Sequence, residues 1–141
     1  MMLHIGHQIL IVPSVEEALP FWTDGLGFVV SKRFQNGYVE LQSSTGQVLA
    51  LVEAKLMQAI LPETSFQMPS HTPKSWQNPL FFSLEVPDLG LTLERIKSYQ
   101  VQILQTPQAM PWGTTVAFVQ EPFSGLCFEI MQNRTYKDSV Q

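Results

Sequence analysis

HQILIVPSVEEAL, residues His7–Leu19, has a counterpart 74 residues further along the chain in FFSLEVPDLGLTL, residues Phe81–Leu93. A repeat at a fixed offset indicates two copies of one structural unit. In each copy an apolar run, a proline and residues at helical spacing predict a strand that turns into a helix. The matching pairs are Leu10 and Leu84, Val12 and Val86, Pro13 and Pro87, Ser14 and Asp88, Val15 and Leu89, and Leu19 and Leu93.

The sequence marks the starts of both helices and the end of the first. Ser14 and Asp88 are good N-caps, because their side-chain oxygens accept bonds from the first free amides of a helix. Ser14 with Glu17 forms a capping box. Pro20 lies inside the first helical pattern, so that helix is expected to be short or kinked. The run DGLG, residues 24–27, is expected to end it with C-cap glycines.

The second half of each unit also repeats. Thr45–Ala54 and Ser124–Gln132 both read as a turn followed by a strand, and Gly46 matches Gly125. FQNGYVELQS (residues 34–43) and GTTVAFVQEP (residues 113–122) precede them as further strand-like runs. The sequence therefore predicts an α+β domain, residues 1–141, with two β-α-β-β-β modules. We expect module 1 at about 4–54, a linker at 55–78 that could begin with one short helix, module 2 at about 79–132 and a tail at 133–141.

Composition narrows the class of function. The net charge is −4 and no run of Lys or Arg occurs, so nucleic acid is not an expected partner, because its binding depends on clustered basic residues. No apolar run approaches the roughly 20 residues of a membrane helix. One cysteine, Cys127, cannot form a disulfide within the chain. These features favour a cytoplasmic protein that does not bind membranes.

The doubled unit, the opening H-x-x-L-x-V-P-S-V and the closing WGTTVAFVQEPFSGLCFEIM together resemble the vicinal oxygen chelate superfamily. That superfamily holds glyoxalase I, extradiol dioxygenases, fosfomycin-resistance enzymes and bleomycin-binding resistance proteins. The resemblance runs from about His4 to Gln132, and the family's D-P-x-G turn appears here as E-P-x-x-G, residues 121–125. It implies two curved mixed sheets around a ligand cavity, and a homodimer.

Metal-using members that this chain resembles carry a ligand on the first and last strand of each module. The positions here hold His7 and Ala50 in module 1, and Phe81 and Glu129 in module 2. Alanine and phenylalanine supply no donor atom, and open catalytic zinc sites keep three protein ligands. We therefore expect no metal, with His7 and Glu129 as residues of a former metal position. One divalent ion at a non-standard site is the alternative.

Strand alternation selects the residues that face the implied cavity. His7 faces it, and His4, three residues earlier, points the other way. Glu53, three residues after Ala50, also points away. Tyr38 and Trp112 are candidates whose facing the pattern does not fix. The other expected cavity residues are Ile9, Ile11, Val48, Val52, Ser83, Glu85, Cys127 and Met131.

Three functions fit these residues. The first is a metal-free binder of an aromatic or amphipathic small molecule, with His7, Glu129, Phe81, Ala50, Ile9, Tyr38, Trp112 and Met131 around the ligand. The second is a metal-dependent lyase, isomerase or dioxygenase. The third is a scaffold whose cavity is filled by its own side chains. The missing donors favour the first, and the sequence leaves open whether the protein is an enzyme.

Overall fold

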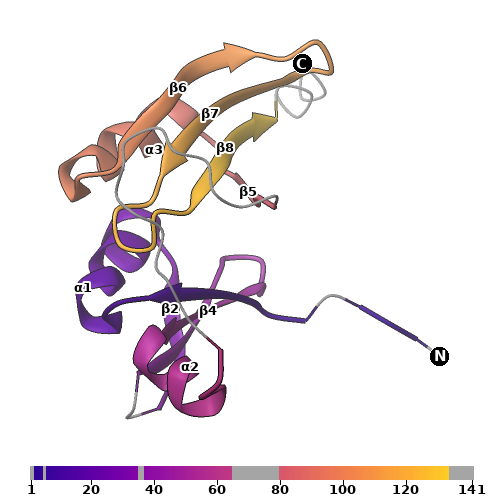
Figure 1. Cartoon of the computed structure of the whole chain (residues 1–141). Helices are drawn as coiled ribbons and strands as arrows, with labels where there is room; N and C mark the ends of the chain where they lie inside the picture. Colours follow the sequence, from indigo (N-terminus) through magenta and orange to yellow (C-terminus); the bar gives the residue numbers. More distant parts are fainter. Residues whose placement is uncertain (1, 5, 35–36, 65–79, 134–141) are drawn as a thin grey trace. The chain divides into compact units, whose positions relative to one another are not determined.

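A computed structural model of the chain describes residues 2–4, 6–34, 37–64 and 80–133 (Figure 1). The chain divides into two compact units, Met1–Met68 (unit 1) and Pro69–Gln141 (unit 2). Each unit is described by itself below. None of the described helices is long and apolar enough to cross a membrane.

Unit 1 contains one four-stranded mixed sheet in the order β1-β4-β3-β2. The pair β1 and β4 is parallel, and the other two pairs are antiparallel. The bounds in chain order are β1 Gln8–Val12, α1 Val15–Pro20, the π-helical turn η1 Phe21–Gly25, β2 Val29–Phe34, β3 Tyr38–Gln42, β4 Val48–Glu53 and α2 Ala54–Ile60.

Unit 2 repeats this arrangement in the order β5-β8-β7-β6, again with one parallel pair, β5 and β8. The α+β class and the two β-α-β-β-β modules are therefore confirmed. Helix α2 is the short helix expected at the start of the linker, and residues 65–79 of that linker lie outside the described residues. The bounds are β5 Ser83–Glu85, α3 Leu89–Ile96, the 3-10 turn η2 Lys97–Tyr99, β6 Gln102–Ala109, β7 Thr114–Gln120 and β8 Cys127–Asn133.

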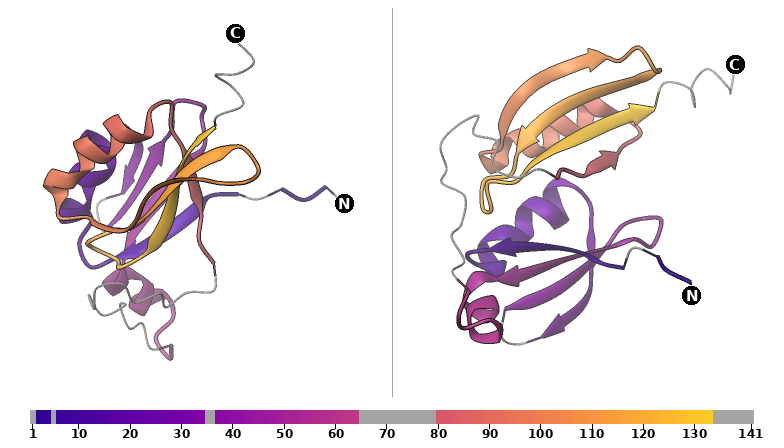
Figure 2. Two further views of the ribbon diagram at one scale, coloured as in Figure 1. Left: turned by 90° about the horizontal axis from the view of Figure 1, so that it is seen from above. Right: turned by 45° about the vertical axis from the view of Figure 1, so that its right-hand side comes forward.

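In each unit one face of the sheet packs against the helix that follows the first strand (Figure 2). In unit 1, α1 and η1 bury Val15, Ala18, Phe21 and Trp22 against the sheet, and Pro20 ends α1 as expected. In unit 2, α3 buries Leu89, Leu93 and Ile96. We call the sheet face turned away from α1 or α3 the open face. The buried sheet residues on the helix faces are Leu10, Val12, Val39, Leu41, Leu49, Leu51, Ala117, Val119, Phe128 and Ile130.

The predicted N-caps are present in both units. The Glu17 amide donates to Ser14 Oγ at 3.3 Å, and the Leu91 amide donates to Asp88 Oδ1 at 3.0 Å. Gly27 adopts a φ of +84° after η1, which agrees with its expected role at the end of the first helical segment.

A second bond ties each helix to the last strand of its own sheet. The Val15 amide donates to Glu53 Oε1 at 3.1 Å, and the Leu89 amide donates to Gln132 Oε1 at 2.7 Å. The two acceptors occupy equivalent positions in β4 and β8. The internal repeat therefore extends to a side-chain contact between the sheet and the first residue of the helix.

The E-P-x-x-G turn holds a fully buried carboxylate. Glu121 accepts hydrogen bonds from the Phe123 amide at 2.6 Å, the Ser124 amide at 3.0 Å and the Ser124 hydroxyl. Gly125 completes the turn with a φ of +75°. A buried charge is tolerated only when it is hydrogen-bonded in this way, so Glu121 has a structural role.

The cap on α3 gives the first testable prediction. Replacing Asp88 by Ala removes the acceptor of the Leu91 amide and should lower the free energy of unfolding by about 1 kcal/mol. Asp88→Asn keeps a side-chain acceptor and is the matched control. Urea unfolding monitored by circular dichroism measures both, and equal stability of Asp88→Ala and wild type would contradict the capping role.

Candidate functional site

The open face of unit 1 is organised by the pairing of three strands. Ile9 of β1 and Glu40 of β3 both pair with Ala50 of β4. Paired residues on neighbouring strands share a face, so these three side chains lie in one row. Ile11, Val52 and Tyr38 form the next row of the same face.

Three polar side chains gather on this face. His7 lies directly before β1, and its Nδ1 is 3.8 Å from Glu40 Oε2. The Tyr38 hydroxyl donates to the same Glu40 oxygen at 2.9 Å. The His7 side chain is 44% exposed, whereas Glu40 is 14% exposed. We call these residues the His7–Glu40–Tyr38 cluster; it combines an imidazole, a carboxylate and a phenol in reach of solvent.

The surroundings of the Tyr38 hydroxyl raise its pKa. Partial burial, the hydrogen bond to Glu40 and the charge of that carboxylate, in this order, raise the pKa of Tyr38 above its ordinary value of 10.0. Each cause disfavours the phenolate. Tyr38 therefore acts as a hydrogen-bond donor in this cluster over the physiological pH range.

Sequence reasoning missed Glu40. It placed the carboxylate position of module 1 at residue 50, where the structure has a fully buried alanine. Glu40 lies on the neighbouring strand, directly beside Ala50. The signal was present in the sequence, because Glu40 is two residues from Tyr38 and a strand places such residues on the same face.

The open face of unit 2 has a different character at the equivalent positions. Phe118 of β7 pairs with Glu129 of β8, as Glu40 pairs with Ala50 in unit 1. The rings of Phe81 and Phe118 meet edge to face, with centroids 5.7 Å apart. Ser83 Oγ donates to Glu129 Oε1 at 2.6 Å. Unit 2 therefore presents an aromatic pair beside a hydrogen-bonded carboxylate.

The other residues singled out in the sequence are spread over both units. Ile9 is 55% exposed on the open face of unit 1, and Met131 is half-buried on that of unit 2, paired with Glu85 and Val116. Trp112 is 73% exposed in the turn before β7. His4 is exposed and lies before β1, as expected. Glu53 lies outside the open face and caps α1, as its strand position predicted.

Few side chains on the open face of either unit could bind a metal ion. Unit 1 brings together one imidazole and one carboxylate, His7 and Glu40, and the carboxylate of Glu129 in unit 2 bonds Ser83. No group of three or more His, Cys, Asp or Glu among the described residues could hold a metal ion. The described residues of either unit by itself do not fit a three-ligand catalytic centre.

A family model matches most of the sequence. It is described as the Glyoxalase/Bleomycin resistance protein/Dioxygenase superfamily, and it matches residues 4–130. This agrees with the resemblance carried by the doubled unit and by the motifs at both ends. A search of curated proteins found no significant match.

Solved structures share the fold. A glyoxalase/bleomycin resistance protein/dioxygenase from Nocardioides is 20% identical, with a TM-score of 0.70 over 94% of this chain and 84% of its own. A glyoxalase-related enzyme from Fulvimarina pelagi is also 20% identical, with a TM-score of 0.75 over 94% of this chain and 89% of its own. A family enzyme from Burkholderia phytofirmans PsJN is 10% identical, with a TM-score of 0.67 over 90% and 96%.

The raised pKa of Tyr38 gives the second prediction. A group whose folded pKa is raised favours the folded state below its unfolded pKa, and that contribution is lost as pH rises through the folded value. Between about pH 8 and about pH 11 the wild type should therefore lose more stability than Tyr38→Phe. Glu40→Gln should lose less than the wild type, because it removes the charge of the carboxylate beside Tyr38 and keeps an acceptor for the hydroxyl. Urea unfolding at each pH measures this, and parallel curves for all three proteins would contradict it.

Proposed function

Because the chain belongs to the Glyoxalase/Bleomycin resistance protein/Dioxygenase superfamily, we propose that it is a metal-free small-molecule-binding protein of this type. Its ligand is an aromatic or amphipathic compound held on the open faces of the sheets. The observation that carries the proposal is the His7–Glu40–Tyr38 cluster, which supplies a few polar groups at fixed positions on an otherwise apolar face.

The surroundings of the cluster support a ligand with an apolar body. Ile9 and Ile11 flank it along β1, and Ile9 is more than half exposed. Ligand sites usually combine apolar walls with a small number of polar groups that orient the bound molecule. His7, whose ring is exposed, is suited to accept or donate one hydrogen bond to the polar end of such a ligand.

Unit 2 supports an aromatic ligand in particular. Phe81 is 44% exposed although it contacts Phe118. An exposed ring in a pair offers a further edge or face to a flat molecule. Glu129, with one oxygen bound to Ser83, adds an acceptor. The aromatic pair of unit 2 is therefore a second candidate surface for a flat ligand, in addition to the polar cluster of unit 1.

A metal-dependent lyase, isomerase or dioxygenase is the second candidate. Glu40 favours it, because its carboxylate lies 3.8 Å from His7 and restores an oxygen donor that Ala50 cannot supply. His7 and Glu40 would hold the ion, and the ion would supply Lewis acidity to a bound oxygen atom. Open catalytic metal sites use three protein ligands, and only His7 and Glu40 are available among the described residues on the open face of unit 1. We therefore rank the metal-dependent enzyme below the metal-free binding protein.

The proposal extends to location and assembly. The single cysteine, Cys127, is buried and lies outside any disulfide, and burial raises its pKa. Free thiols persist in the reducing cytoplasm, so we place the protein there, as a homodimer without nucleic-acid or membrane partners. Size-exclusion chromatography with light scattering measures the assembly.

Ligand binding is tested by thermal shift against a panel of flat aromatic compounds, which should include phenols and catechols. A compound that binds the folded protein raises its melting temperature. His7→Ala and Glu40→Gln should abolish the shift of a compound bound at the His7–Glu40–Tyr38 cluster, and His4→Ala, an exposed histidine outside the cluster, is the matched control. A scaffold with a filled cavity would respond to no compound in the panel.

Elemental analysis of the purified protein separates the two candidates. If the protein is metal-free, purified wild type should contain much less than one transition-metal ion per chain. One tightly bound Zn, Ni, Mn or Fe per chain, lost in His7→Ala and retained in His4→Ala, would favour the enzyme.

A further inference from the structure

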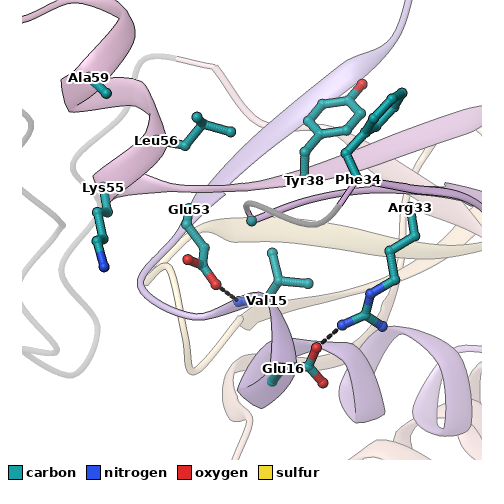
Figure 3. Close-up of a pocket in the computed structure, with 10 residues that line it drawn as sticks. Val15, Glu16, Arg33, Phe34, Tyr38, Glu53, Lys55, Leu56 and Ala59 are labelled. Atoms are coloured by element: carbon teal, nitrogen blue, oxygen red, sulfur yellow. Dashed lines mark hydrogen bonds and ion pairs between the residues drawn. The ribbon is translucent and has the colours of Figure 1, made fainter.

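A cavity of about 480 Å³ lies at one end of the unit 1 sheet, where β4 leads into α2 (Figure 3). Its walls come from the start of α1, the ends of β2 and β4, the beginning of β3 and helix α2. Neither His7 nor Ala50 borders it, so it is separate from the former metal position, although the Tyr38 ring borders both. The volume falls within the usual range of small-molecule sites.

Glu53 is one of four charged residues that line this cavity, with Glu16, Arg33 and Lys55. One of its oxygens accepts the Val15 amide, and in Figure 3 the other oxygen points away from Val15. Among the described residues, Val15 is the single recorded donor to this carboxylate. The second oxygen is therefore available to a ligand.

The chain itself shows that capping does not require this charge. In unit 2 the equivalent acceptor is Gln132, a neutral amide, which accepts the Leu89 amide at 2.7 Å. The same bond is made in unit 1 by a carboxylate at 3.1 Å. The bond to the first helical residue can therefore be made by a neutral or by a charged acceptor, and unit 1 has the charged one.

Gly37, directly before β3, lies close to the carboxylate. It adopts a φ of +93°, and a Cβ placed on it would lie 2.8 Å from Glu53 Oε2. Any other residue would be strained and would press against the carboxylate. The Gly37 carbonyl also accepts the Glu53 amide at 2.8 Å, so the charged side chain has a fixed position in the cavity wall.

Among the described side chains, no ion pair with Glu53 is recorded. Arg33 is paired with Glu16, and these two partners cancel one another at the rim. Lys55 is exposed, and no ion pair between it and Glu53 is recorded among the described side chains. A cationic group can therefore reach Glu53 without displacing an existing partner.

Apolar groups complete the cavity. The rings of Phe34 and Tyr38 lie with centroids 5.7 Å apart, and Figure 3 shows them with Leu56 above Glu53 in the view. Phe34 is more than half exposed, so its ring can be covered by a ligand. Aromatic faces attract cations as well as apolar surfaces.

We propose that this cavity binds a small amphipathic amine. The protonated amino group donates to the free oxygen of Glu53, and the apolar body packs against Phe34, Tyr38 and Leu56. A charge-assisted hydrogen bond to a fixed carboxylate supplies the selectivity for a cation. This site differs from the one proposed for the open faces, although Tyr38 borders both, and binding of the amine requires neither His7 nor Glu40.

The test uses three probes that share a phenylethyl body: phenethylamine, 2-phenylethanol and phenylacetate. Amide chemical shifts of the full chain, labelled with ¹⁵N, report where each probe binds at neutral pH. Phenethylamine should shift Val15, Gly37 and Leu56 and bind about tenfold more tightly than 2-phenylethanol, because it adds a charged hydrogen bond. Phenylacetate should cause no shifts.

Glu53→Gln is the decisive variant, since it keeps the acceptor for Val15 and copies Gln132. It should remove the preference for phenethylamine while its melting temperature stays close to wild type. Gln132→Glu adds a charge in unit 2 and should leave binding at the cavity unchanged. Equal binding of phenethylamine by wild type and Glu53→Gln would overturn the proposal.

Two further variants keep the test informative. Phe34→Ala changes an exposed ring and should weaken phenethylamine several-fold without unfolding, so it serves if Glu53→Gln folds poorly. His7→Ala should leave phenethylamine binding intact. Shifts confined to Ile9 and Ala50, or their loss in His7→Ala, would place the amine on the open face and overturn the second site.

Discussion

Side-chain alternation along β4 and β8 is the constraint on which both faces of each unit depend. In β4, Leu49, Leu51 and Glu53 belong to the helix face, and Ala50 and Val52 belong to the open face. A shift of one residue would exchange these sets and expose the core. Because the last strand pairs with both neighbours, its register also fixes which residues of β1 and β3 can meet on the open face. The register therefore decides which residues pack against the helix and which lie on the open face.

The two units are alike on the helix face and differ on the open face. Their helix faces are both apolar, and the bond from the last strand to the helix is kept, with Glu53 in one unit and Gln132 in the other. On the open faces the equivalent residues differ in charge and size. Where unit 1 has His7 and Glu40, unit 2 has Phe81 and Phe118. The carboxylate lies on the third strand in unit 1 and on the fourth strand in unit 2.

The sequence was sufficient for features that depend on local spacing. The repeat predicted both modules, Ser14 and Asp88 predicted the helix starts, and Pro20 predicted the early end of α1. The position of Glu53 away from the open face followed from alternation alone. These predictions succeeded because each depends on residues a few positions apart, whose geometry is set by the period of a strand or a helix.

Glu40 could not be assigned to His7 in the same way. Their contact requires the register of β3 against β4 and of β4 against β1, and both registers follow from long-range pairing. The cavity beside Glu53 likewise requires the position of α2 and the close approach of Gly37.

Unit 1 therefore carries carboxylates in two environments, Glu40 in the open-face cluster and Glu53 at the sheet end. Glu40 is 14% exposed and bonded to Tyr38, whereas Glu53 keeps one oxygen for a partner. Since the two carboxylates are held by separate contacts, the charge of either can be removed without altering the hydrogen bonds of the other.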